Sequence, residues 1–257
     1  MRVICITQAR LGSTRLPEKV LKSVSGRSLI DYHCSRVAAA ELVDTHIVAT
    51  TDTALDTTLV EHVKTLNITP VPQVFSGSED NVLDRFYQAA IKAEASARDV
   101  IVRLTGDCPL ICPQLIDKVV SEHIAYNPTG YTHLSLGYWP RGFDVEVFGM
   151  PILTDAWLNA SSSQELEHVT FYMYSRPQSY RVMPVENGLT EYAQLRLCID
   201  EPNDLRMFDT FMHTQGESLA LMSGQEICQT LLEHPEIVQI NQNIEQIQPT
   251  TQDKEIL

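Results

Sequence analysis

The chain has 257 residues, enough for one large α/β domain or for one domain that carries a smaller insertion. Hydrophobic residues make up 44% and charged residues 20%, which favours a packed core over disorder. The formal net charge of −14 argues against nonspecific nucleic-acid binding. No apolar run approaches the roughly 20 residues of a membrane span, and the first residues lack the pattern of a signal peptide. We therefore expect a cytoplasmic protein that binds neither nucleic acid nor membrane.

Strand-like and helix-like patterns alternate along the first half of the chain. Residues 3–6 form a continuous apolar run of strand length, whereas Leu55, Leu59 and Val63 recur at helical spacing. In chain order the predicted elements are a strand at 3–7, a helix at 28–40, a strand at 46–50, a helix at 55–66, a strand at 69–74, a helix at 80–95, a strand at 99–104 and a helix at 113–126. This alternation predicts a doubly wound α/β fold, a mostly parallel sheet flanked by helices. Prolines in the third strand place it nearer an edge of the sheet.

The pattern changes after residue 130. Residues 131–136 and 143–148 alternate like antiparallel strands, and 163–174 has a helical pattern. A strand at 194–199 and a helix from Pro202 follow. We interpret 130–185 as a small antiparallel insertion within a single domain spanning 1–257, where it forms a ligand site or a dimer contact. The tail after Pro249 is polar, and we expect it to be mobile.

Positive charge is concentrated directly after the first strand. Residues 8–19 hold Arg10, Arg15 and Lys19 together with Gly12 and Ser13. Backbone N–H groups and hydroxyls bond phosphate oxygens, while Arg and Lys neutralise their charge, so such a loop suits a triphosphate. The spacing matches neither the Walker pattern nor the Rossmann glycine pattern, which argues against an ordinary ATPase or dehydrogenase. On spacing alone, a solvated basic loop is the alternative.

Two aspartates follow predicted strands. Asp107 comes after the strand at 99–104, and Asp200 comes after the strand at 194–199. In α/β sheets ligands bind beyond the carboxyl ends of the strands, and carboxylates placed there can hold Mg²⁺ against bound phosphates. Each has a simpler alternative: Asp107 as a turn residue, and Asp200 or Glu201 as the cap of the next helix. Together they predict a metal and triphosphate site.

The first loop resembles a known family. The run Gln8-Ala9-Arg10-Leu11-Gly12-Ser13-Thr14-Arg15-Leu16-Pro17, followed two positions later by Lys19, is similar to the signature loop of the CMP-sugar synthetases. This family includes the 3-deoxy-manno-octulosonate and acylneuraminate cytidylyltransferases. The chain most resembles their spore-coat polysaccharide biosynthesis branch. Further matches run in the same order along nearly the whole chain, at residues 78–85, 103–110, 140–148, 165–170 and 200–205.

The resemblance implies a nucleotide-diphospho-sugar-transferase-like fold, CTP and Mg²⁺ as ligands, and commonly a homodimer. It implies transfer of CMP from CTP to a hydroxyl of an acidic sugar or similar small acid, with release of pyrophosphate, in surface polysaccharide biosynthesis. The implied catalytic residues are Lys19, Arg10, Arg15 and Asp107, and the implied metal ligands are Asp107 and Asp200. The implied nucleotide-binding residues are Ala9, Arg10, Leu11, Gly12, Ser13, Arg15, Lys19, Ser78, Asn81, Arg85, Thr105 and Gly106.

By the same resemblance the acceptor binds in the insertion region. Its candidate residues are Arg141, Asp144, Glu146, Glu167 and His168. An arginine such as Arg141 is suited to pair with an acceptor carboxylate. The alternatives are that Asp144 and Glu146 form the solvated face of a strand, and that Glu167 and His168 are a pair on a helix surface.

Some positions depart from the family pattern. Glu18 stands where the family has glycine, and Thr105 and Cys108 replace the glutamine and glutamate of the octulosonate enzymes, which argues against that particular acceptor. Two other functions remain open. A glycosyltransferase of the same fold would use a nucleotide-sugar donor, although three cations suit a triphosphate better than a diphosphate ester. A non-catalytic module that binds a nucleotide is the second.

Overall fold

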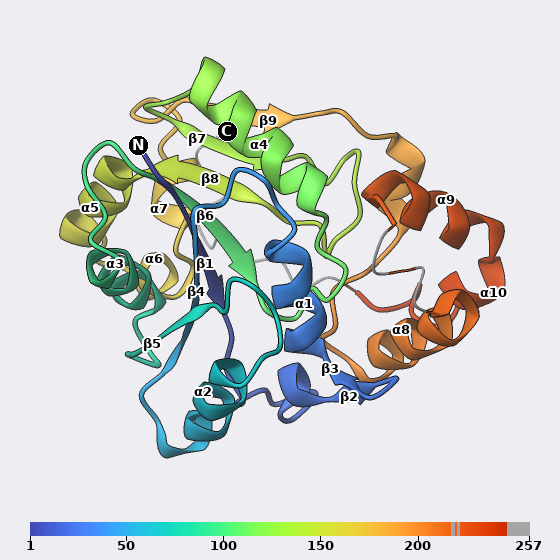
Figure 1. The fold of residues 1–257 in the computed structure, drawn as a ribbon. Coiled ribbons are helices and arrows are strands. Elements are labelled where there is room, and N and C mark those ends of the chain that lie inside the picture. Colours follow the sequence, from blue (N-terminus) through green and yellow to red (C-terminus); the bar gives the residue numbers. More distant parts are fainter. Residues whose placement is uncertain (217–218, 220–221, 246–257) are drawn as a thin grey trace.

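A mixed sheet with helices on both faces forms the centre of the computed structural model (Figure 1). Over the described residues, 1–216, 219 and 222–245, the sheet has seven strands in the order β5-β4-β1-β6-β8-β7-β9. The predicted tail after Pro249 lies outside these residues. The parallel strands are β1 (Val3–Gln8), β4 (Thr45–Thr51), β5 (Gln73–Gly77) and β6 (Val100–Thr105). This confirms the predicted mostly parallel α/β fold, with β5 at the edge.

The region after residue 130 extends this same sheet. Its strands are β7 (Tyr131–Leu134), β8 (Glu146–Gly149) and β9 (Val182–Val185). Strand β8 pairs antiparallel with β6 and with β7, as the alternating pattern predicted, whereas β9 pairs parallel with β7. A separate small antiparallel sheet is formed by β2 (Ser23–Val24) and β3 (Arg27–Ser28).

Helices follow the strands of the parallel half. They are α1 (Leu29–Val37), α2 (Thr57–Lys64), α3 (Val82–Lys92) and α4 (Pro113–Tyr126). The later helices are α5 (Met150–Asn159), α6 (Ser163–Glu167), α7 (Phe171–Tyr174), α8 (Pro202–Gln215), α9 (Gly224–Glu233) and α10 (Pro235–Val238). Short 3₁₀ helices are η1 (Lys19–Leu21), η2 (Ala54–Asp56) and η3 (Thr190–Gln194). No helix in the described part of the chain combines the length and the hydrophobicity that a bilayer crossing requires.

Strand β1 is buried on both faces, which explains its continuous apolar run. Successive side chains of a strand point to opposite faces of the sheet. Cys5 therefore packs in one hydrophobic cluster with residues of α1 and α4, while Ile4 and Ile6 pack in a second cluster with residues of α3 and α5. A strand in this position can form only in the middle of a sheet covered on both sides.

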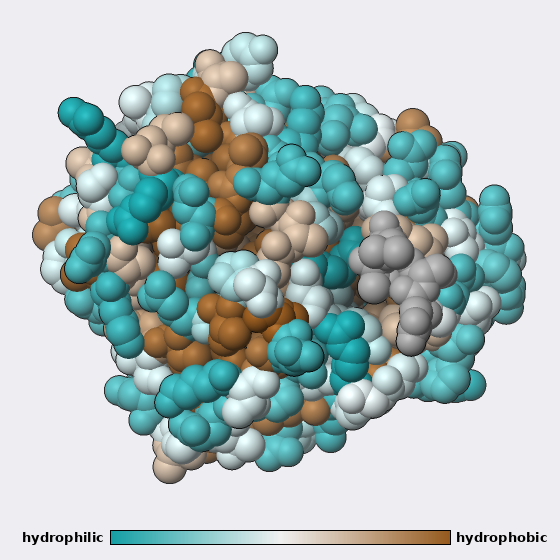
Figure 2. Space-filling model, viewed as in Figure 1, coloured by the Kyte–Doolittle hydropathy of each residue, from teal (hydrophilic) through white to brown (hydrophobic). Residues whose placement is uncertain are grey.

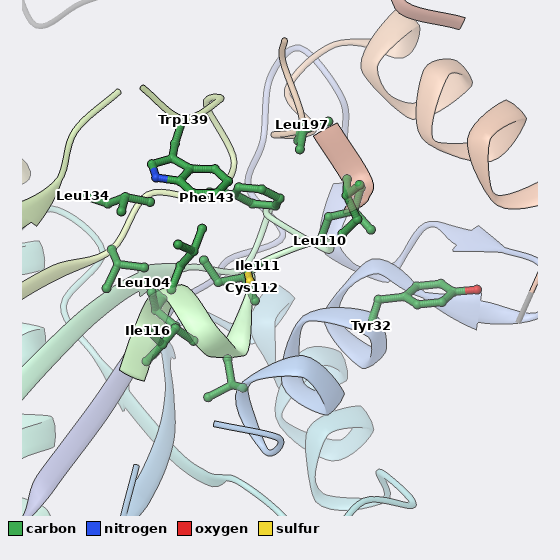
Figure 3. Close-up of a cluster of buried hydrophobic side chains, with 14 of the residues drawn as sticks. Tyr32, Leu104, Leu110, Ile111, Cys112, Ile116, Leu134, Trp139, Phe143 and Leu197 are labelled. Carbon is green, nitrogen blue, oxygen red and sulfur yellow. The ribbon is translucent and has the colours of Figure 1, made fainter. Parts of the chain in front are cut away.

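The insertion region shares the core of the parallel half. Trp139 and Phe143, which follow β7, pack in the same cluster as Leu104 of β6 and Ile116 of α4 (Figure 3). The two aromatic rings are 6.0 Å apart between centroids. On the face shown in Figure 2, hydrophilic residues cover most of the surface, and hydrophobic residues show between them in smaller patches.

Several predicted elements differ from the structure in their bounds or their type. Strand β5 begins at Gln73, not at residue 69, because Pro70 and Pro72 lack the N–H that a sheet ladder needs. The helix predicted at 163–174 is two short helices, α6 and α7, separated at His168, whose backbone leaves the helical region.

The strand predicted at 194–199 was also wrong. Gln194 instead ends η3, and the residues after it form one isolated bridge, between Arg196 and Arg141, and no regular strand. Strand β8 likewise starts at Glu146 and not at 143, after Gly142, whose φ of +105° turns the chain. Strand β9 and helix α5 were not predicted.

Candidate active site

A cavity of about 740 Å³ opens beyond the carboxyl ends of β1 and β6. Its wall includes Gln8, Ala9, Arg10, Gly12, Ser13, Thr14, Arg15, Lys19 and Val20 from the first loop. The other lining residues are Glu79, Asp80, Val82 and Arg85 around the start of α3, then Thr105, Asp107 and Asp200, and then Ser163, Leu166, Glu167 and His168. The cavity therefore brings the basic loop, both predicted metal ligands and two predicted acceptor residues together.

Lys19 lies between the two aspartates. Its Nζ donates to Asp107 Oδ2 at 2.6 Å and to Asp200 Oδ1 at 2.7 Å. Burial by itself would lower the pKa of Lys19, but the two carboxylates outweigh burial and raise it. Burial would likewise raise the pKa of Asp107, yet the charge and hydrogen bond of Lys19 hold it below its ordinary value. Lys19 and Asp107 are therefore both charged at neutral pH.

The other two cations of the loop also face carboxylates. Arg10 Nη1 lies 3.2 Å from Glu79 Oε1, and Arg15 Nη1 lies 3.0 Å from Glu201 Oε1. Arg15 Nη2 is 3.5 Å from Asp200 Oδ1 as well. These arginine pairs are about half exposed, so solvent screens them and each contributes little to stability. They are contacts that an incoming anion can replace.

A buried aspartate that the sequence analysis missed anchors the basic loop. Asp56 is 1% exposed, and its Oδ1 accepts the backbone N–H of Leu11 at 2.7 Å. Its Oδ2 accepts from the hydroxyl of Thr50 at 2.8 Å and from the N–H of Thr51 at 3.0 Å, at the end of β4. The sequence did carry one signal for this role. Asp56 comes shortly after the predicted strand at 46–50, at the same edge of the sheet as the basic loop. Asp56 fixes the loop to its neighbouring strand.

Three buried polar side chains form a chain of hydrogen bonds that ends on the loop of Asp107. The ring of His33 in α1 bonds the carbonyl of Cys108 through Nδ1 at 3.0 Å, so Nδ1 carries the proton. Burial lowers the pKa of His33 to about 4, and its neutral Nε2 therefore accepts from the Thr7 hydroxyl at 2.8 Å. The Thr7 oxygen in turn accepts from Nε2 of His46 at 2.9 Å. This chain of bonds holds the loop after β6 in position.

The loops after β1 and β6 meet at Gly106. Its N–H donates to the carbonyl of Gln8 at 2.8 Å. A Cβ at this position would lie 2.9 Å from the Cβ of Ala9, closer than side-chain carbons approach each other. Glycine is therefore required for the close approach of the two loops that carry Lys19 and Asp107.

The predicted nucleotide-binding residues divide into two groups. Arg85 and Thr105 line the cavity with the loop residues, and no described residue accepts a bond from the buried Nε of Arg85. Leu11 packs instead in the core with α1 and α2, and Gly106 makes the contact between the two loops.

Two further predicted residues, Asn81 and Ser78, shape the start of α3. Asn81 caps α3, where its Oδ1 accepts the N–H of Asp84 at 2.8 Å. The Ser78 hydroxyl accepts the Asn81 N–H at 3.0 Å, and the Ser78 carbonyl accepts from Arg85 at 2.6 Å, so both orient the start of α3.

The predicted acceptor residues also divide. Glu167 and His168 line the cavity, whereas Arg141, Asp144 and Glu146 do not. Arg141 Nη1 donates to Asp144 Oδ1 at 2.8 Å, and burial raises the pKa of Asp144 despite that contact.

Glu146, the first residue of β8, belongs to a mostly buried polar cluster. It accepts from Arg103 and from the hydroxyl of Tyr131, and from the Thr170 hydroxyl at 2.6 Å. Burial would raise its pKa, but the Arg103 charge and these donors keep it below its ordinary value. Arg103 Nη2 also bonds Gln8 Oε1 at 3.1 Å, which links the cluster to a residue of the cavity wall.

The pair Asp107 and Asp200 suits a magnesium ion. One oxygen of each carboxylate already contacts the same cationic nitrogen, so a single cation can reach both. Over the described residues no group of three or more His, Cys, Asp or Glu side chains forms a metal site. Magnesium is commonly held by one or two carboxylates together with substrate phosphates and water, and this donor set fits that pattern.

The fold and the site together define a nucleotidyltransferase. A family model for cytidylyltransferases matches residues 4–244, and the chain belongs to this family. It is 36% identical over 250 residues to an uncharacterized protein, MJ1063, of Methanocaldococcus jannaschii, covering 96% of this chain and 97% of that protein. It is 35% identical to the spore coat polysaccharide biosynthesis protein SpsF of Bacillus subtilis, covering 84% and 88%. A solved cytidylyltransferase from Leptospira borgpetersenii has the same fold, with a TM-score of 0.84 at 24% identity, over 96% of this chain and 100% of that one.

Proposed function

We propose that this cytidylyltransferase transfers CMP from CTP to a hydroxyl of an acidic sugar or similar small acid, releases pyrophosphate, and acts in surface polysaccharide biosynthesis. The observation that carries the proposal is the single cavity in which the basic loop faces Asp107, Asp200, Glu167 and His168. One cavity thus offers cations for a triphosphate, carboxylates for a metal and polar groups for a second substrate. The name of the SpsF relative supports the pathway.

The loop cations would bind the triphosphate of CTP. Lys19 is the most enclosed of them, with a side chain 14% exposed, against 47% for Arg10 and 41% for Arg15. We assign Lys19 to the α-phosphate and the two arginines to the β- and γ-phosphates. When a hydroxyl attacks the α-phosphorus and pyrophosphate leaves in line, negative charge grows on the phosphoryl oxygens and on the leaving pyrophosphate. Fixed cations stabilise this charge.

Asp107 and Asp200 would hold Mg²⁺. The ion supplies further neutralisation of phosphate charge when it is bound. The residues beneath keep the two carboxylates in position: His33 bonds the loop of Asp107, and Arg196 Nη2 lies 3.2 Å from Asp200 Oδ2. Rigid support of this kind matters because misplaced metal ligands weaken both binding and catalysis.

Glu167 and His168 would contact the acceptor. Both line the same cavity as the basic loop, at the end of α6, which packs against α3. His168 can take the proton from the attacking hydroxyl, the general-base role for which histidine is suited. Arg141 lies outside the cavity and pairs with Asp144, so a role for it requires movement or a second subunit of the proposed homodimer.

Pyrophosphate release tests the proposal directly. The protein is incubated with Mg²⁺, each of the four nucleoside triphosphates in turn, and a panel of sugar acids and smaller acids. We expect pyrophosphate only with CTP together with an acceptor, and a CMP-linked product. A glycosyltransferase would release no pyrophosphate from CTP, and a non-catalytic module would bind CTP without turnover. Either result would reject the proposal.

Two lysine variants make the same assay specific to the site. Lys19→Met removes the charge at the α-phosphate and is expected to lower the rate about a hundredfold or more. Lys22→Met removes the same charge three residues away, outside the cavity wall, and should keep the wild-type rate. Equal activity of the wild type and Lys19→Met would show that Lys19 does not act on the phosphate.

A further inference from the structure

We infer that Lys19 occupies the position of the divalent cation in the free enzyme, so that the metal site becomes available only when a nucleotide triphosphate draws Lys19 away. The inference rests on the proposed function and adds to it an order of events. Nucleotide and metal would bind together, and a metal ion alone would bind weakly.

The positions of the contacting atoms carry the first step. Lys19 Nζ lies 2.6 Å from Asp107 Oδ2 and 2.7 Å from Asp200 Oδ1. A magnesium ion bound to the same two oxygens would lie about 2.0–2.1 Å from each. The ammonium and the ion would then compete for the same two oxygens, and two cations held so close together repel strongly. The metal can therefore bind both carboxylates only after Lys19 has left.

The other oxygens of the two carboxylates also have neighbours in the free enzyme. Asp200 Oδ2 lies 3.2 Å from Arg196, and Arg15 is 3.5 Å from Asp200 Oδ1. Asp107 Oδ1 lies within 3.5 Å of the Cys108 sulfur, which is buried beside it. A metal ion approaching without nucleotide meets the charges of Lys19, Arg15 and Arg196, although Glu201 and Asp204 also pair with the two arginines.

The triphosphate provides the exchange. Its oxygens offer Lys19 and Arg15 the anionic partners that the carboxylates supply in the free enzyme, and this frees the carboxylates for the metal. Every charge then keeps an opposite partner, so the exchange costs little desolvation. Lys19 begins η1 and follows Glu18, and its side chain lies on the cavity wall, where the phosphates would arrive.

Manganese binding to the nucleotide-free protein tests this inference. Free Mn²⁺ is measured by electron paramagnetic resonance as protein is titrated in, with the wild type and with Lys19→Met. We expect Lys19→Met to bind Mn²⁺ at least about tenfold more tightly than the wild type, because the competing cation is gone. Lys19→Arg, which keeps the charge, should bind as weakly as the wild type.

Two controls fix the location of the effect. Lys22→Met changes the net charge of the protein equally and should leave Mn²⁺ affinity unchanged. Adding Asp107→Asn to Lys19→Met should abolish the gain. If Lys19→Met binds Mn²⁺ no more tightly than the wild type, the inference is wrong. Because this measurement uses no nucleotide, it gives an answer even if the pyrophosphate assay fails.

A second measurement needs only the wild-type protein. An analogue of CTP with a methylene bridge between the α- and β-phosphorus atoms cannot transfer CMP. It should raise Mn²⁺ affinity at least about tenfold, and Mn²⁺ should raise affinity for the analogue by the same factor, since coupling between two ligands is reciprocal. Binding of both ligands without mutual enhancement would overturn the inference.

Discussion

The two halves of the molecule use charge in opposite ways. Around the basic loop, Arg10, Arg15 and Lys19 pair with carboxylates across an open cavity. In the insertion region, Glu146 is enclosed with Arg103 among hydroxyl groups and does not line the cavity. The first set of ion pairs can exchange its partners with a ligand. The second set does not line the cavity, so a ligand bound there cannot replace its partners.

This difference shows why a charged residue in a family motif need not contact a ligand. Burial alone does not separate the two uses, because the side chains of Lys19 and Asp107 are 14% and 22% exposed and those of Arg103 and Glu146 are 18% and 14% exposed. The difference is that only the first set lines the cavity. An ion pair on the cavity wall can exchange one partner for a ligand, and each charge then keeps an opposite partner. A buried pair loses much, because the remaining charge is left without a partner or water. The three predictions that follow test this contrast.

Among the single substitutions, Glu146→Ala should have the largest effect on stability. It leaves the guanidinium of Arg103 buried without its carboxylate, which is expected to lower the free energy of unfolding by about 3 kcal/mol. Urea unfolding measures the change. Glu167→Ala, at an exposed residue of the cavity wall, should change stability by less than about 0.5 kcal/mol and alter the KM for the acceptor instead. A stable Glu146→Ala protein with a raised acceptor KM would reverse our assignment of the two glutamates.

Two buried histidines, His33 and His46, should make the free energy of unfolding depend on pH. Burial lowers the pKa of His33 to about 4 and that of His46 to about 3, whereas in the unfolded chain both titrate near 6.5. Between these values the unfolded state binds more protons, so stability is full above pH 6.5 and falls as the pH drops toward 4. At pH 5 each histidine should cost about 2 kcal/mol relative to pH 7.

Urea unfolding at pH 7 and pH 5 gives the measurement, and His46→Gln supplies the comparison. This variant should show a smaller loss between the two pH values than the wild type does. His213→Gln, at an exposed position of α8, should show the wild-type loss. An unchanged pH dependence in His46→Gln would mean that the buried histidines do not set it.

Glu18 should give the smallest effect. Its φ of 54° lies in the left-handed region, which costs a residue with a side chain about 1–2 kcal/mol. Glu18→Gly removes that strain but gains chain entropy in the unfolded state, so stability should rise by about 0.5–1 kcal/mol. Glu94 is a matched control, exposed and with a φ of 55°, in the turn after α3.

The two glycine variants differ in what they should do to the ligand. Glu94→Gly should stabilise the protein by a similar amount without affecting CTP binding. Glu18→Gly also removes a negative charge from the phosphate loop and should tighten CTP binding about two- to threefold, as is usual for an exposed charge. Thermal unfolding and CTP titration separate the two effects. Equal CTP affinity in both variants would show that the charge of Glu18 does not reach the phosphates.

The sequence alone determined the parallel half and its loop. The apolar run in β1 and the helical spacing in α2 depend on near neighbours in the chain, so pattern is enough to predict them. The placement of Arg10, Arg15 and Lys19 just after a strand was also local. The family resemblance added the cytidylyltransferase assignment, which the match over residues 4–244 confirms.

Only the tertiary structure decided which charged residues meet. Asp56 became a loop anchor because β4 lies beside β1 in the sheet, and no spacing in the chain expresses that neighbour relation. Residues 194–199 had the composition of a strand but found no neighbour beyond one bridge, since sheet formation depends on partners far away in sequence. In the same way, Lys19 meets Asp107 and Asp200 across 88 and 181 residues, a contact that exists only once the sheet has formed.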